Sequence, residues 1–203
     1  MRITDQDRQA IAEAITRAEK TTSGEIFCVV TRSSDDYRFI PLLWAALAAL
    51  VLPAPLILFT LVPAQAIYLA QLVCFLVLAP GLSWWPLRIK CVPPAIRRRR
   101  AHARALELFL AHGLHTTSAR TGVLLFLSLA ERHAEVVADE GIYARVAPDV
   151  WDEAVAALVA GARKGAPGEA FIAAIEICGK VLTAHFPPRA DDRDELANQL
   201  VEL

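Results

Sequence analysis

The most informative absence in this chain is that of charge: no Asp, Glu, Lys or Arg occurs from residue 39 to residue 87. A single membrane span needs about 20 apolar residues, and about 25 at most. The uncharged stretch is roughly 49 residues long, which is too long for one span and fits two spans joined by a tight turn. We therefore predict a transmembrane hairpin with spans over 42–62 and 66–87 and with Pro63, Ala64 and Gln65 at the turn.

Cysteine is scarce, and the spacing of the cysteines supports neither a CxxC redox site nor a zinc site. The chain has four cysteines, and none forms a CxxC pair or has the spacing of zinc ligands: Cys28, Cys74, Cys91 and Cys178. Cys28 lies in a predicted strand and Cys74 in a predicted span, so a disulfide between them is disfavoured, and we expect reduced, structural thiols.

The chain also has no GxGxxG, P-loop or GxSxG motif, so neither nucleotide binding nor a hydrolase nucleophile elbow is supported.

The basic residues around the predicted spans set the expected orientation. Arg32 and Arg38 precede the hairpin, the turn between the spans has no basic residue, and a larger group follows: Arg88, Lys90, Arg97, Arg98, Arg99, Arg100 and Arg104. Positive residues stay on the cytoplasmic side of a membrane. Both flanks, both termini and the domain that they form are therefore expected in the cytoplasm. The first 38 residues lack a basic region that leads into a short apolar run, so they do not read as a cleaved signal.

Outside the hairpin, helical patterns alternate with short apolar runs. We predict helices over 5–19, 93–112, 148–164 and 169–185, and strands over 25–31, 121–129 and 134–138. Thr4 is the predicted N-cap of the first helix, and Gly113 is the predicted end of the second. The acidic tail, 191–203, is expected to form a last short helix or a strand at the sheet edge. Strands near the middle with helices around them imply an α/β fold with a small mixed sheet.

The predicted organisation is one α/β domain that the hairpin interrupts. Residues 1–38 form its first part, 39–92 the hairpin, and 93–203 the remainder. About 150 residues then lie outside the hairpin, which is enough for one domain with its own core. Within the first span, Pro53 and Pro55 are expected to kink or interrupt the helix.

Four stretches, in order, resemble a known family: TSGEIFCVV at 22–30, RTGVLLFLSLAERHAEVVADEGI at 120–142, VWDEAV at 150–155, and HFPPRADDRDELANQLVEL at 185–203. Together they are similar to the TPM-domain family, which includes thylakoid-lumen repair proteins and many bacterial membrane-anchored proteins. The resemblance implies a three-layer α/β domain with a central mixed sheet, and a location in the bacterial inner membrane. It also implies one of two roles: an accessory factor in the assembly of membrane complexes, or a calcium-binding protein with weak phosphatase activity.

The chain departs from that family pattern in two ways. Its hairpin is inserted within the domain instead of being appended at one end. Its tail reads Glu195-Leu196-Ala197-Asn198, where similar bacterial sequences are expected to have Glu-Leu-Pro-Asp. The missing acid removes one candidate metal ligand, which argues against the phosphatase role in this chain.

Acidic residues form the candidate site for a divalent cation. Two follow a predicted strand and four lie in the tail: Asp139, Glu140, Asp191, Asp192, Asp194 and Glu195. Calcium and magnesium need several oxygen ligands, which carboxylates from two loops can supply. A DEG turn is also ordinary turn chemistry, an acidic tail is an ordinary solvated surface, and the tail lacks the spacing and glycine of an EF-hand loop. No catalytic residue is assigned.

The strongest positive feature is the run Arg97, Arg98, Arg99 and Arg100. Its place close to the predicted membrane suits contact with anionic lipid headgroups, at about 1 kcal/mol for each basic residue. Nucleic-acid binding needs basic residues spread over a face with aromatic partners, and the net charge of −1 supplies no such field.

Two smaller motifs have plainer explanations. His112 and His115 have HxxH spacing, but a helix end favours histidine through the macrodipole alone. Thr22 and Ser23 stand beside Gly24 and could approach a phosphate. A helix-to-strand turn in which Gly24 supplies backbone freedom accounts for them as well.

The function we expect is that of a membrane-anchored, non-catalytic accessory or assembly factor for a membrane protein or complex. The alternative is a weak, calcium- or magnesium-dependent phosphatase, and a third interpretation is a sensor of lipid surfaces through residues 97–100. The expected partners are membrane lipid and another membrane protein or a second copy of the chain, with no nucleic acid. Small residues could mediate lateral helix packing: Ala45, Ala46, Ala48 and Ala49.

Overall fold

The computed structural model describes residues 3–117, 119–188 and 195–203. These residues divide into two units: Met1–Ser34 with Arg98–Leu203, and Asp35–Arg97. We call the first the α/β unit and the second the hairpin unit, and describe each by itself.

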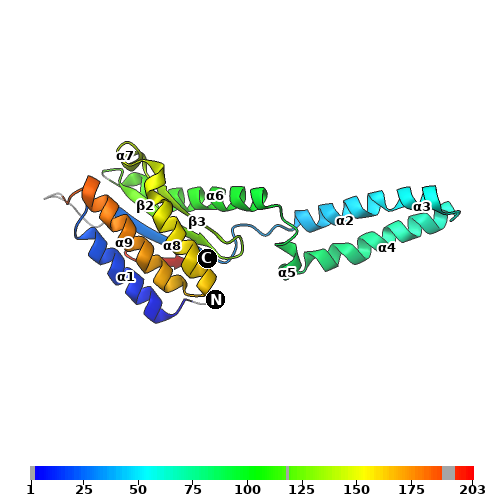
Figure 1. Cartoon of the computed structure of the whole chain (residues 1–203), viewed down its shortest axis with the longest axis horizontal. Helices are drawn as coiled ribbons and strands as arrows, with labels where there is room; N and C mark the ends of the chain where they lie inside the picture. The colour runs from blue at the N-terminus through cyan, green and yellow to red at the C-terminus, as the bar shows by residue number, and fades with distance from the viewer. Residues whose placement is uncertain (1–2, 118, 189–194) are drawn as a thin grey trace. The chain divides into compact units, whose positions relative to one another are not determined.

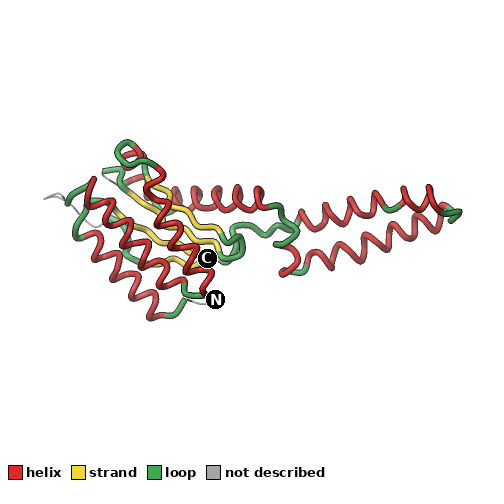
Figure 2. Tube along the Cα trace, viewed as in Figure 1, coloured by secondary structure: helices red, strands yellow, loops and turns green. Residues whose placement is uncertain are grey.

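The α/β unit is built on a mixed sheet of four strands in the order β3-β2-β1-β4, drawn in yellow in Figure 2. β1 (Glu25–Thr31) pairs in parallel with β2 (Gly122–Ser128) and β4 (Leu200–Glu202), whereas β3 (His133–Ala138) runs antiparallel to β2. Every residue of β1 and β2 is buried, which explains why both strands read as continuous apolar runs. The predicted small mixed sheet is confirmed, and part of the tail forms its edge strand.

Helices cover both faces of this sheet because β1 and β2 direct alternate side chains to opposite faces. Ile26 and Cys28 of β1 belong to a core with α1 (Asp5–Glu19), α8 (Asp152–Lys164) and α9 (Pro167–His185). Phe27 and Val29 belong to a second core with α6 (Pro94–Ala111). Figure 1 shows α1, α8 and α9 together on one side of the strands. The largest buried side chains include Phe126 and Phe171.

The ends of the helices follow the signals in the sequence. Thr4 is the N-cap of α1 and forms a capping box with Asp7, whose pKa is lowered by the hydrogen bonds from Thr4. Gly113 has φ +73° and follows the end of α6. Three short helices complete the unit: the 3₁₀ helices η1 (Leu114–Thr116) and η2 (Pro148–Trp151), and α7 (Glu140–Tyr143). α7 stands where the sequence predicted only a turn.

Gly24 is explained by close packing and not by the predicted backbone freedom. The positive-φ residues of the described chain include Gly113 and Gly165 but not Gly24, so backbone freedom does not explain this glycine. A Cβ at this position would meet the side chain of Leu182 at 3.0 Å. Gly24 therefore allows α9 to approach the start of β1 closely.

The hairpin unit contains two helices that are long and apolar enough to cross a membrane, by length and composition: Phe39–Phe59 and Ala64–Ser83. The first comprises α2 (Phe39–Val51) and α3 (Pro53–Phe59), which meet at Leu52; Leu52 is itself helical, with φ −53° and ψ −40°, and its N–H donates to the Ala48 carbonyl. The second is α4, and α5 (Trp85–Arg88) follows it.

The helix boundaries differ from the predicted spans by a few residues. The first helix begins at Phe39 and ends at Phe59, because Thr60 is extended, with φ −136° and ψ 158°. Pro63 is the N-cap of α4, so Ala64 and Gln65 lie in the helix and not in the turn. Trp84, with ψ 129°, ends α4 before residue 87.

Large apolar side chains of the hairpin unit point outward. Leu43 is 58% exposed, Leu50 69% and Phe59 83%, whereas Ala45 and Ala49 are buried where α2 packs on α4. The share of the most apolar stretch that is buried is 11% in the first helix and 6% in the second. The helices thus contact each other through small residues and present their large apolar residues to the surroundings.

Candidate functional site

The edge of the sheet at which β1, β2 and β4 begin and β3 ends carries the predicted acids that the structure describes: Asp139, Glu140 and Glu195. We call it the amino edge. Glu25 of β1 pairs with Gly122 of β2, and the backbone N–H of Asp139 donates to the carbonyl of Gly122 at 2.9 Å. Glu25 and Asp139 therefore lie on the two sides of Gly122, and both are buried, with exposed fractions of 7% and 4%.

The Asp139 carboxylate is engaged at both oxygens. Arg120 donates to it from Nε at 2.8 Å and from Nη2 at 3.0 Å, and the backbone N–H of Glu140 donates to Oδ1 at 2.7 Å, so Asp139 caps α7. The hydrogen bond to Asp139 raises the pKa of Arg120. This bidentate pair neutralises the buried carboxylate and compensates for its loss of water.

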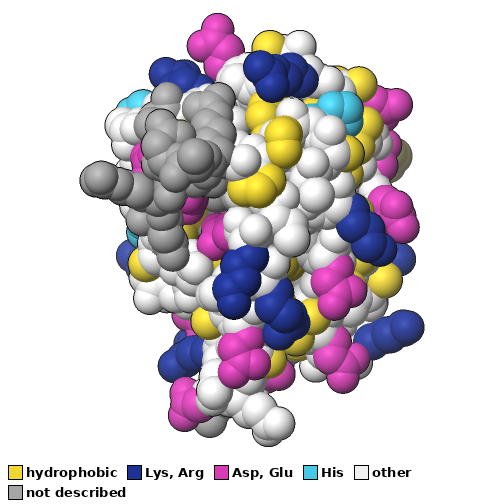
Figure 3. Space-filling model, turned by 90° about the vertical axis from the view of Figure 1, so that its left-hand side faces the viewer, with side chains coloured by type: hydrophobic (Ala, Val, Ile, Leu, Met, Phe, Trp, Pro, Cys, Tyr) yellow, Lys and Arg dark blue, Asp and Glu magenta, His cyan; other side chains and the backbone are white. Residues whose placement is uncertain are grey.

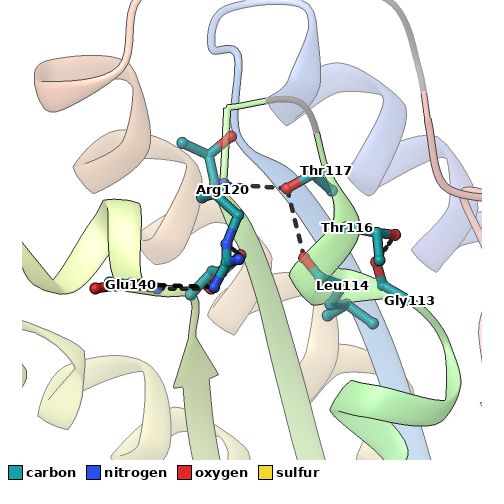
Figure 4. A network of polar contacts seen from close by, with 8 residues as sticks. Gly113, Leu114, Thr116, Thr117, Arg120 and Glu140 are labelled. Carbon is teal, nitrogen blue, oxygen red and sulfur yellow. Dashed lines mark hydrogen bonds and ion pairs between the residues drawn. The ribbon is translucent and has the colours of Figure 1, made fainter.

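A turn held by threonine hydroxyls presents Arg120 to Asp139 (Figure 4). Thr117 Oγ1 donates to the Leu114 carbonyl at 3.4 Å and accepts from the Thr121 N–H at 3.1 Å. The Leu114 carbonyl also lies over Gly122, where a Cβ would approach its oxygen to 2.5 Å. Arg120 itself has φ +55°, a costly conformation for a residue with a side chain, which the ion pair and the turn hold in place.

The other predicted acids that the structure describes, Glu140 and Glu195, do not join Asp139 in a ligand set. The Glu140 side chain is 88% exposed and lies 3.7 Å from Arg120. Glu195 reaches the amino edge through its backbone, because its N–H donates to Glu25 Oε1 at 3.3 Å. Asp191, Asp192 and Asp194 lie outside the described residues. Within the part of the chain that the structure describes, no group of three or more His, Cys, Asp or Glu is placed to hold a metal.

On one face of the α/β unit, the described residues carry charges of both signs. Figure 3 shows acidic and basic side chains interspersed there, with small hydrophobic groups between them. Asn198, which stands where an acid was expected, donates from Nδ2 to Thr16 Oγ1 at 3.2 Å. The amino edge thus holds the ion-paired carboxylate of Asp139 beside the buried Glu25.

A histidine–glutamate–histidine bridge is a feature that the sequence analysis missed. Glu135 of β3 lies 3.2 Å from Nδ1 of His102 on α6 and 3.0 Å from Nε2 of His133. Burial raises the pKa of Glu135, but the hydrogen bonds from His133 and His102 lower it by more, so the pKa lies below its ordinary value of 4.5. The spacing of His133 and Glu135 places them on one face of a strand, whereas nothing in the sequence indicates His102.

A second missed cluster lies at the opposite edge, where β1, β2 and β4 end, which we call the carboxyl edge. The buried Glu131 carboxylate accepts hydrogen bonds from Ser33 Oγ at 3.1 Å, from the Ser34 N–H at 2.9 Å and from Ser128 Oγ. Ser34 Oγ also donates to Ser128 Oγ at 3.0 Å. Glu131 therefore fastens the segment after β1 to the β2–β3 turn.

The predicted basic run and the histidine pair are placed as follows. Arg98, Arg99 and Arg100 are exposed in the first turns of α6, and Arg97 is half-buried in the hairpin unit. The ring of His112 packs on Phe27 with a centroid distance of 4.7 Å, which is a core contact.

All four cysteines are free, as expected, and burial raises the pKa of the Cys178 thiol to about 12.

Comparison with known proteins identifies a fold and no family. No family model matches this chain, and no curated protein matches it significantly. Among solved structures, the chain is similar to the NMR structure of the BA42 protein from the psychrophilic bacterium Bizionia argentinensis. The TM-score is 0.63 with 21% sequence identity, over 100% of this chain and 97% of that one. At this identity the likeness shows the fold alone, a mixed α/β fold.

Proposed function

We propose that this chain is an inner-membrane protein of bacteria whose hairpin unit crosses the bilayer twice. The observation that carries the proposal is the outward direction of the large apolar side chains on α2, α3 and α4. Water solvates such a surface poorly, whereas hydrocarbon accepts it, and an α-helix is one of the few structures that can span a bilayer.

The orientation we propose has the α/β unit and both termini in the cytoplasm. The support comes from the basic residues on both flanks of the hairpin, Arg32 and Arg38 before it and residues 97–100 after it, and from their absence between residues 60 and 63. Four free cysteines accord with a reducing compartment.

The role we propose is non-catalytic: an accessory or assembly factor for a membrane protein or complex. In support of it, Arg120 occupies both oxygens of Asp139, the most buried of the predicted acids that the structure describes. Of the four alanines expected to contact a partner, Ala45 and Ala49 are buried within the hairpin. A partner helix, or a second copy, would therefore contact one of the two exposed flanks of α2, of which one carries Ala46 and the other Ala48.

A weak divalent-metal-dependent phosphatase is the second candidate. The observation in its favour is that the fold brings Glu25, Asp139 and the backbone of Glu195 to one edge of the sheet. Calcium or magnesium would have to displace Arg120 from Asp139 in order to use that carboxylate. Resemblance to the TPM-domain family supports both candidates.

A thermal-shift titration separates the two. The full chain in neutral detergent is titrated with CaCl₂ and with MgCl₂, alongside Asp139→Ala and an exposed control, Glu153→Ala on α8. Binding to the folded state raises the melting temperature once the ligand exceeds its Kd. The accessory role predicts no saturable shift at millimolar cation. A saturable shift that Asp139→Ala abolishes and Glu153→Ala retains would favour the phosphatase.

A further inference from the structure

We infer that the carboxyl edge of the sheet carries a binding site for an anionic phospholipid. The site is a cleft of about 510 Å³ between the ends of β2 and α8, within the size range of ligand pockets. Apolar side chains form its floor and two guanidinium groups flank it: Leu127, Leu129, Val159 and Ala162, with Arg132 and Arg163. The inference rests on the proposed function, because the bilayer around the hairpin supplies the lipid.

The charge at this cleft is unbalanced, in contrast to that at the amino edge. Arg120 and Arg132 both have positive φ, +55° and +52°. Arg120 is paired with the buried Asp139, whereas neither Arg132 nor Arg163 forms an ion pair with any residue that the structure describes. The nearest acid in sequence, Glu131, is engaged by three serine residues. Two exposed guanidinium groups without a carboxylate are suited to a phosphate.

A third such arginine extends the positive charge along the same edge. Arg32 follows β1, its carbonyl accepts from the Ala130 N–H at 3.0 Å, and its side chain has no ion pair among the described residues. Arg32 and Leu129 also line a neighbouring cleft of about 490 Å³ at the ends of β1 and β4, where the acid Glu202 is ion-paired with Arg8. The carboxyl edge thus combines apolar surface with cations. The cations complement the anionic headgroup of a lipid, and the apolar surface complements the first methylenes of its chains.

The chain connects this same edge to the hairpin unit at both crossings. The α/β unit ends its first segment at Ser34 and resumes at Arg98. Ser34 is bonded to Ser128 and Glu131, and His102, one turn after Arg98, is bonded to Glu135 near the start of β3. Residues 32–38 separate the end of β1 at Thr31 from Phe39, so these two ends lie about 28 Å apart at most. If the hairpin spans the bilayer as proposed, this short connection limits the distance between the carboxyl edge and the lipid headgroups.

The test is a titration of the full chain in neutral detergent with dioctanoyl phosphatidylglycerol, with dioctanoyl phosphatidylcholine and with inorganic phosphate. We expect phosphatidylglycerol to raise the melting temperature saturably and well beyond the other two. The double variant Arg132→Asn, Arg163→Ala should weaken the apparent affinity about 30-fold, at about 1 kcal/mol for each basic residue. Asparagine is chosen because it tolerates positive φ.

Two controls keep the result interpretable. Arg17→Ala with Lys20→Ala removes the same charge from exposed positions on α1 and its C-cap, and should leave the affinity for phosphatidylglycerol unchanged. Ala162→Trp fills the floor with both guanidinium groups intact, and should also weaken binding. Equal shifts with both lipids, or equal losses in the two double variants, would overturn the site. A shift with inorganic phosphate that matches the lipid would replace it with a free-phosphate site.

Carbonate extraction of membranes that hold the wild-type chain distinguishes a failure of the lipid site from a failure of the proposed function. If the chain is released, the hairpin does not span the bilayer, and the proposed function and the lipid site fail together. If the chain is retained while phosphatidylglycerol gives no specific shift, only the lipid site fails.

Discussion

Two pairs of packed helices in this molecule differ in the side that faces outward. In the α/β unit, α1 and α9 approach closely, since a Cβ on Gly179 would meet Ala18 at 3.0 Å, and their outer faces carry charged residues such as Arg17 and Lys180. In the hairpin unit, α2 meets α4 through Ala45 and Ala49, and the outer faces carry leucine, valine and phenylalanine. Small residues lie at the helix–helix contact in both pairs, so the contact itself does not distinguish the two pairs. The outer faces do: the charged face of the first pair is suited to water, and the apolar face of the second pair is suited to lipid.

A pair of phenylalanines gives the largest expected contrast. Phe171→Ala should lower the free energy of unfolding by about 3–5 kcal/mol, because Phe171 is fully buried in the core of the α/β unit. Phe59→Ala, at a site 83% exposed in the hairpin unit, should change it by less than about 0.5 kcal/mol. Urea unfolding in neutral detergent measures both. Comparable losses would mean that Phe59 is packed in a core.

For a pair of exposed leucines, the larger effect is expected in the hairpin unit instead of the α/β unit. Leu50 is 69% exposed near the middle of the first apolar helix, and Leu110 is 58% exposed on α6. Leu50→Arg should cost about 2.5–3.5 kcal/mol in membrane insertion, whereas Leu110→Arg should cost nothing because its side chain is exposed to water. The measurement is the fraction of each variant that stays in carbonate-washed membranes. If Leu50→Arg inserts as well as Leu110→Arg, the outer face of the hairpin does not meet lipid.

The ion pair at the amino edge provides a smaller effect. Asp139→Asn should lower the free energy of unfolding by about 1.5–3 kcal/mol, because it removes the charge that two Arg120 nitrogens and the cap of α7 share. Glu140→Gln, at an 88% exposed side chain, is the matched control and should be neutral. An unchanged urea midpoint for Asp139→Asn would contradict the structural role of this carboxylate.

The smallest expected effect depends on pH. Because the pKa of Glu135 is lowered in the folded state, its contribution to stability is complete above the ordinary value of 4.5 and is lost as the pH falls through the lowered value. Urea midpoints from pH 6 to pH 3 should therefore fall more steeply for the wild type than for Glu135→Gln. Parallel curves would show that the bridge to His102 and His133 does not perturb Glu135.

The sequence predicted the elements that depend on local signals and missed what depends on contacts between distant residues. The apolar runs gave β1 and β2, and Thr4 and Gly113 marked helix ends, because periodicity and capping are local. The partner of Asp139 was not predicted, since Arg120 reaches it across 19 residues only after β2 and β3 pair. The same holds for His102 with Glu135 and for Ser34 with Glu131, whose sequence separations are 33 and 97.

The most direct test of the account is the accessibility of single cysteines on the two sides of the membrane. In a cysteine-free background, Leu61→Cys lies between the two apolar helices and Gln199→Cys lies in the α/β unit, both exposed. A thiol reagent that cannot cross membranes should label Leu61→Cys only in spheroplasts and Gln199→Cys only in inverted vesicles. Labelling of both positions from the same side would contradict a hairpin that crosses the bilayer.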